Sequence, residues 1–153
     1  ERGSNAKVAP RNLNPEMLME WFAFKASDEV FGLDTQYVYR VVDDIRVTPV
    51  PFTPSCYLGL FYYRGELFEV IDVAILLGLG KSNRRTDHCV LILTKWSDKR
   101  WGLLPDQTLG LLWTDGDKGN QNPQFDDGRT VRYLRPEEIW NALTGLPYGP
   151  GKI

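Results

Sequence analysis

The chain has 153 residues, of which 42% are hydrophobic and 12% aromatic, which is enough for one folded domain with a buried core. Eighteen basic residues against twenty acidic ones give a formal net charge of −2, which argues against a protein that depends on binding nucleic-acid phosphates. Only two cysteines occur, and no apolar run reaches the ~20 residues that cross a bilayer, so we expect a soluble, cytoplasmic domain without disulfides.

The N-terminal half has the pattern of short β-strands. Two apolar runs flank the polar residues 27–29 and predict a β-hairpin that begins at Leu18. Residues 35–42 fit either a helical turn or a further strand. Residues 47–54 contain Pro49, Pro51 and Pro54, which exclude a helix interior and a central strand, so we expect an extended connection.

An arginine and a glycine interrupt the most hydrophobic stretch of the chain. Residues 56–63 and 67–73 are predicted to form two strands, with a tight turn at residues 64–66 between them. Gly65 can supply a positive φ there, which most residues adopt only with strain. A short helical turn that ends at a glycine is expected after Val73.

The C-terminal half repeats the alternation of strands and turns. Residues 88–96 and 101–113 predict strands, and residues 114–128, rich in glycine and polar residues, predict a loop. Residues 129–134 predict a last strand, and residues 135–145 predict a helix that has proline in its first turn and ends at a glycine.

These elements predict an all-β, mainly β fold with six to nine short strands and an accessory C-terminal helix. The similar patterns of residues 18–73 and 88–134 suggest two barrel-like halves. We expect residues 1–16 to be a disordered or loosely ordered leader, residues 17–146 to form the domain, and residues 147–153 to be a tail.

No catalytic or metal-binding motif stands out. His88 is the only histidine and is followed by Cys89, and a cysteine with a histidine can act as a nucleophile and its base. Neighbouring residues in a strand point to opposite faces, however, so these two do not form such a pair. One histidine and two distant cysteines give no recognised set of metal ligands. We therefore predict no enzymatic activity, no metal and no other cofactor.

A series of short motifs runs in fixed order from Val41 to Gly78: a pair of valines, "TPVP", "YLG", the Arg-Gly turn and "VID" before "LLG". Further on, "WGLLPD" has the spacing of another strand pair. In this order and spacing, residues 21–143 resemble the CheW-like family of chemotaxis coupling (adaptor) proteins.

The resemblance implies two SH3-like five-stranded β-barrel subdomains with a C-terminal helix. It also implies a non-enzymatic adaptor that links the cytoplasmic helical tip of methyl-accepting chemoreceptors to the regulatory domain of a chemotaxis histidine kinase. Such an adaptor is cytoplasmic and is associated with receptor arrays at the inner membrane. It binds no nucleic acid and does not insert directly into the membrane.

The resemblance places an apolar partner-binding groove beside the Arg-Gly turn. A groove of this kind can receive side chains of a receptor helix, and arginine can stack and fork its hydrogen bonds at the rim. The candidate partner-binding residues are Val38, Arg40, Val41, Leu58, Gly59, Tyr63, Arg64, Gly65 and Glu69.

Three of these residues depart from the family pattern. Arg40 stands where the family often has glutamate, Tyr63 replaces an asparagine, and Glu69 replaces a proline. Two neighbouring arginines repel each other weakly. We therefore expect Glu66 or Glu69 to lie within about 4 Å of Arg40 or Arg64 as an ion-pair partner.

Two other interpretations remain open. The chain is either a CheW-like module of a larger signalling protein, or a β-barrel that binds a small ligand or some other protein. The second rests on aromatic rings that can stack on ligands, namely Trp96, Trp101, Trp113 and Tyr62. Three or more of these rings exposed in one concave patch would favour ligand binding, whereas buried or scattered rings would not.

Overall fold

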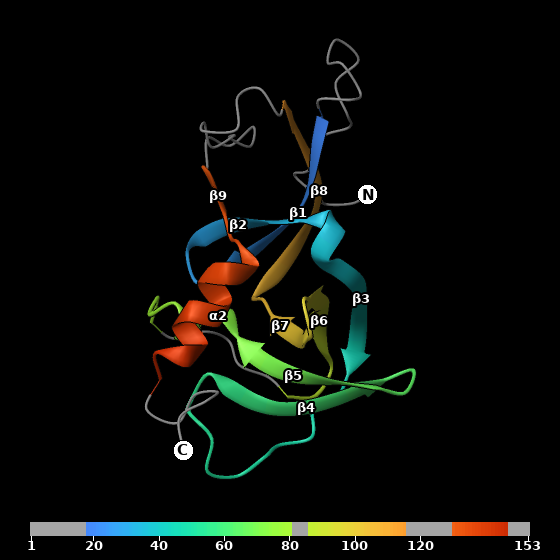
Figure 1. The fold of residues 1–153 in the computed structure, drawn as a ribbon, viewed down its shortest axis with the longest axis vertical. Helices are drawn as coiled ribbons and strands as arrows, with labels where there is room; N and C mark the ends of the chain where they lie inside the picture. The colour runs from blue at the N-terminus through green and yellow to red at the C-terminus, as the bar shows by residue number, and fades with distance from the viewer. Residues whose placement is uncertain (1–17, 81–85, 116–129, 147–153) are drawn as a thin grey trace.

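The computed structural model describes residues 18–80, 86–115 and 130–146, and its β-strands and helices are drawn in Figure 1. A 3-10 helix, Thr35–Tyr37, comes before the third strand. In chain order the elements are β1 (Leu18–Ala26), β2 (Glu29–Asp34), β3 (Val38–Ile45), β4 (Tyr57–Tyr63), β5 (Glu66–Asp72), α1 (Val73–Leu76), β6 (Cys89–Trp96), β7 (Lys99–Leu104), β8 (Gln107–Asp115), β9 (Val131–Tyr133) and α2 (Pro136–Thr144).

The strands form two sheets, so the predicted mainly β fold is confirmed. The first sheet has the described strands in the order β8-β1-β2-β9, and the second has the order β3-β6-β7-β5-β4. The predicted division into two consecutive halves is wrong, because each sheet takes strands from both halves of the chain. Two parallel pairs, β2 with β9 and β5 with β7, join strands that are far apart in sequence.

Three buried clusters hold this arrangement together. One cluster, with Phe68 and Leu93, lies within the second sheet, and another, with Trp21 and Leu112, lies within the first. The largest cluster lies between the sheets and includes Phe24 from β1, Trp101 from β7 and Ile139 from α2. Helix α2 therefore links the two sheets through a shared core, as its position in Figure 1 shows.

The ends of several elements agree with their sequence signals. Helix α2 begins at Pro136 and is capped by Gly145, as predicted, and the side chain of Glu138 also accepts a hydrogen bond from the N–H of Arg135. Residues 35–42 form both of the alternatives, a 3-10 turn followed by β3. Of the loop predicted over residues 114–128, residues 114 and 115 belong to β8 instead, and residues 116–128 lie outside the described ranges.

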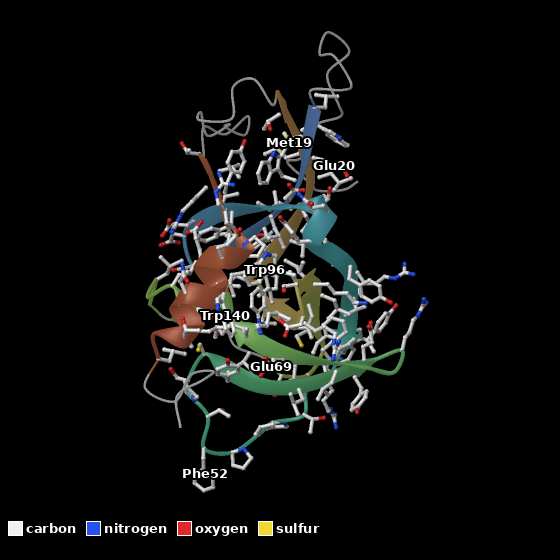
Figure 2. The ribbon with its side chains drawn as sticks, viewed as in Figure 1. Met19, Glu20, Phe52, Glu69, Trp96 and Trp140 are labelled. Atoms are coloured by element: carbon white, nitrogen blue, oxygen red, sulfur yellow. The ribbon has the colours of Figure 1, made fainter. Side chains whose placement is uncertain are left out.

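The connection between β3 and β4 contains neither a helix nor a named strand, as its prolines predicted. It is not extended throughout, however, because it turns at residues 51 and 52, where Phe52 has a φ of 62°. Within it, Thr48 makes the single bridge to a strand, exchanging hydrogen bonds of 2.9 and 2.8 Å with Leu60. Figure 2 shows Phe52 at the outer end of this connection, where its side chain is fully exposed. No helix in the described ranges is both long and apolar enough to cross a membrane. The predicted leader, residues 1–16, and the predicted tail, residues 147–153, lie outside these ranges. So does Met17, the first residue of the predicted domain.

Candidate functional site

The Arg-Gly turn joins β4 to β5 as a two-residue hairpin. Tyr63 pairs with Glu66, which leaves Arg64 and Gly65 as the two turn residues. Both have positive φ, 51° for Arg64 and 81° for Gly65, as a type I′ turn requires. Gly65 was predicted to take this conformation, and Arg64 was not. Asparagine, aspartate and glycine are the usual first residues of such turns, so an arginine there is unusual.

Aromatic and ionic contacts tie this hairpin to β3 and β6. The ring of Tyr39 is stacked on Phe68 at a centroid distance of 6.1 Å and meets Tyr63 edge to face, also at 6.1 Å. The ammonium of Lys95 lies 3.8 Å from the centre of the Tyr39 ring and 2.6 Å from a carboxylate oxygen of Glu66. We call Tyr39, Tyr63, Phe68, Lys95 and Glu66 the hairpin brace.

The brace fixes where Arg64 is presented. The guanidinium carbon of Arg64 lies 5.2 Å from the centre of the Tyr63 ring, a cation–π contact, while the residue stays exposed. Tyr63 is held in turn by Tyr39 and by Phe61, whose ring is stacked on it at 6.3 Å. The arginine is therefore carried by a supported turn at the end of a paired hairpin.

The expected carboxylate partner for the arginines is absent among the described residues. No carboxylate in those ranges lies within 4.0 Å of the guanidinium of Arg40 or Arg64. The hypothesis that Glu66 or Glu69 fills this role is therefore wrong. Glu66 is held instead by Lys95, which the sequence analysis did not consider. Desolvation of the carboxylate by surrounding protein atoms raises the pKa of Glu69, although its side chain is exposed by area, and the charge of Lys99 opposes that rise.

The candidate partner-binding residues fall into two groups. Arg40, Val41, Arg64, Gly65 and Glu69 are exposed, and Val38 and Tyr63 are half-buried. Leu58 is buried in the core of the second sheet, and Gly59 is packed against the backbone of Thr48. The structure thus brings the exposed residues of β3 close to the turn through the contact between Tyr39 and Tyr63, and gives Leu58 and Gly59 a supporting position.

Two exposed aromatic residues beside the turn were missed as candidates for partner binding. Tyr39 is 37% exposed and Tyr62 is 69% exposed, and Val41 between them in sequence is 41% exposed. The signal for Tyr39 was its place beside two candidates, Val38 and Arg40. We call Tyr39, Arg40, Val41, Tyr62 and Arg64 the β3–hairpin surface.

The aromatic rings that suggested ligand binding are not gathered in one exposed patch. Trp101 is fully buried and is stacked on Trp96 at 5.8 Å, and Trp113 lies in the other sheet, on β8. Figure 2 shows Trp96 in the middle of the molecule beside α2. Only Tyr62 of the four is exposed, which argues against the ligand-binding interpretation.

The metal-ligating groups do not cluster within the described ranges. No three histidine, cysteine, aspartate or glutamate side chains gather there around a common point. The Nδ1 atom of His88 lies 2.6 Å from Asp44, and the thiol of Cys89 contacts the carbonyl of Ile45. His88 and Cys89 therefore each contact the end of β3 and not each other.

Comparison with known proteins decides the family. The model of the CheW-like domain matches residues 20–136, most of the chain. The chain belongs to the CheW-like domain family. It is similar to the chemotaxis protein CheW of Helicobacter pylori, with 27% identity over 152 residues, covering 91% of this chain and 92% of that protein. It is also similar to protein FrzA of Myxococcus xanthus, with 33% identity over 92 residues, covering 60% and 57% of the two chains.

The same family fold is found in a solved structure. The scaffolding protein TtCheW from Thermoanaerobacter tengcongensis superposes with a TM-score of 0.67 at 23% identity, covering 81% of this chain and 93% of that one. This CheW-like fold agrees with the implied pair of SH3-like subdomains, of which the first shows four described strands where five were expected. The resemblance seen in the sequence motifs is thus confirmed.

The conformation of Arg64 leads to a prediction about stability. Because a left-handed φ is unfavourable for arginine and well tolerated by asparagine, we expect Arg64→Asn to raise the free energy of unfolding by about 1 kcal/mol. Urea unfolding followed by tryptophan fluorescence measures this change. Arg100→Asn, an exposed arginine in the regular strand β7, should not be stabilising. A loss of stability in Arg64→Asn would contradict the strained-turn interpretation.

Proposed function

We propose that this CheW-like chain is a non-enzymatic adaptor that couples methyl-accepting chemoreceptors to a chemotaxis histidine kinase. In this role it is cytoplasmic and joins receptor arrays at the inner membrane. One face binds the helical tip of the receptor, and another binds the regulatory domain of the kinase. The receptor site is the β3–hairpin surface.

The observation that carries the proposal is the conformation of Arg64. Residues in sparsely populated backbone conformations cluster at ligand-binding and switch sites. Here a strained, exposed arginine is kept in a turn where asparagine would be more stable, and the hairpin brace holds it in place. Such an arrangement suits a side chain whose contact is with a partner molecule.

The surface also has the composition of a helix-binding site. Tyr39, Val41 and Tyr62 offer exposed apolar area, and Arg40 and Arg64 are exposed cations in the same strand or hairpin. Tyrosine and arginine are enriched among residues that contribute most to binding energy at protein interfaces. An amphipathic receptor helix can place its apolar residues on the exposed apolar side chains and its polar residues near the two arginines.

Co-sedimentation tests this function. Receptor signalling hairpins from the same genome are displayed on vesicles, mixed with the cognate histidine kinase, and pelleted with the wild-type chain or with Arg64→Ala. We expect the wild type to pellet with the assembly and Arg64→Ala to pellet at least about fivefold less, as for loss of an interface arginine. Multivalent display is used because single coupling contacts are weak.

Lys25→Ala is the matched control, because Lys25 is a basic residue of β1 in the other sheet. It should pellet like the wild type. Failure of the wild type to pellet with any of several receptors and the kinase would leave the chain with the family fold but without the proposed coupling role.

A further inference from the structure

The charge of the β3–hairpin surface and its brace is one-sided. Their residues include three cations, Arg40, Arg64 and Lys95, and one carboxylate, Glu66. Glu66 is engaged by Lys95 at 2.6 Å. The two arginines have no acidic partner among the described residues, whereas Lys99 and Arg132 are each paired with an acid.

The two arginines lie on either side of an aromatic contact. Arg40 follows Tyr39 in β3, and Arg64 follows Tyr63 at the turn, and the rings of these tyrosines are 6.1 Å apart. Val41, 41% exposed, comes next in β3. Each of the two arginines thus follows, in sequence, a tyrosine of this contact, and the exposed apolar side chain of Val41 follows Arg40.

We propose that the partner segment recognised here is an acidic amphipathic helix, in which carboxylates lie next to the apolar residues that dock on the surface. This inference rests on the proposed function, because it specifies which receptor tips the adaptor accepts. A carboxylate opposite Arg40 or Arg64 receives forked hydrogen bonds from a guanidinium that has no competing acid in its own chain. A tip with lysine or arginine at those positions is repelled, which makes the arginines determinants of specificity.

Arg40 is the better residue for testing this, because its φ is ordinary and it is not part of the brace. The probe is a receptor tip from the same genome that binds the wild type in the co-sedimentation experiment. It is labelled with a fluorophore and titrated with the wild type, Arg40→Gln and Arg40→Glu. We expect Kd at low salt to rise about threefold for Arg40→Gln and at least about tenfold for Arg40→Glu, with the difference shrinking as salt is added.

A charge exchange tests the chemistry directly. A tip variant in which the acidic residues of the docking helix are replaced by lysine should bind the wild type poorly and bind Arg40→Glu better than the wild type. Lys25→Glu makes the same change of charge at a half-buried residue of the other sheet, and it should leave Kd within about twofold of the wild type, since salt screens the interaction between distant charges.

The outcomes separate this inference from the function on which it rests. If the wild type and Arg40→Glu bind the tip equally well, the acidic-partner inference alone is overturned. The same holds if the wild type binds the lysine tip as tightly as the acidic tip. Wild type that binds no receptor tip overturns the proposed function and, with it, this inference. Circular dichroism of each variant confirms that it is folded.

Discussion

Gly59→Ala should be among the most destabilising single substitutions in this protein, with a loss of about 3 kcal/mol or more in the free energy of unfolding. Gly59 has a φ of 144°, which favours glycine, and a Cβ atom there would lie 2.0 Å from the carbonyl oxygen of Thr48. That oxygen cannot easily move, because Thr48 and Leu60 exchange two backbone hydrogen bonds. Urea or thermal unfolding measures the loss.

Gly65→Ala is the matched control for this prediction. Gly65 also has a positive φ, 81°, but a Cβ atom there would meet nothing within 4 Å. Its substitution should therefore cost only the backbone strain, about 1 kcal/mol. Equal losses for the two variants would show that the close approach of β4 to Thr48 contributes nothing, and would contradict the steric argument.

The case of Gly59 also shows what a motif can and cannot tell. The "YLG" motif marked Gly59 as a candidate for partner binding, which stays a prediction, and the structure shows that Gly59 is also required for close packing. A glycine inside a strand often marks a close approach of another backbone segment. Which segment approaches is decided by the bridge between Thr48 and Leu60, and no local pattern in the sequence predicts that bridge.

Local signals predicted the elements well, and long-range pairing escaped them. Alternating apolar residues and turn-forming residues located the strands, and Pro136 and Gly145 located α2, because these signals act within a few residues. The interleaving of the sheets depends on parallel pairs such as β5 with β7, whose strands are separated by a helix and by β6. Sequence alternation does not specify which buried strands pair.

The candidate site was predicted in part for the same reason. The Arg-Gly turn and the exposed residues of β3 follow from local sequence and from the family motifs. The brace depends on Lys95, which is 29 residues from Glu66, and on the ring of Tyr39 reaching Phe68. The expectation that Glu66 would form an ion pair with an arginine failed because Glu66 pairs with Lys95 from β6.

Phe68 connects the buried core to the candidate site, so Phe68→Ala should lower both stability and receptor capture. Phe68 is fully buried in the cluster of the second sheet, and its ring supports that of Tyr39 at 6.1 Å with an interplanar angle of 12°. Its removal leaves a cavity and should lower the free energy of unfolding by about 3–5 kcal/mol. Because the brace loses its base, the variant should also capture less receptor at temperatures where it remains folded.

Two further variants separate the effect on stability from the effect on receptor capture. Phe68→Leu keeps most of the buried volume and should lose about 1–2 kcal/mol of stability, while receptor capture falls because the flat ring beneath Tyr39 is gone. Tyr62→Ala removes an aromatic ring that is 69% exposed and should change stability by less than about 0.5 kcal/mol. Capture by Phe68→Leu that equals the wild type would show that Tyr39 keeps its position without the stacked ring, so that Phe68 would not be a necessary part of the brace.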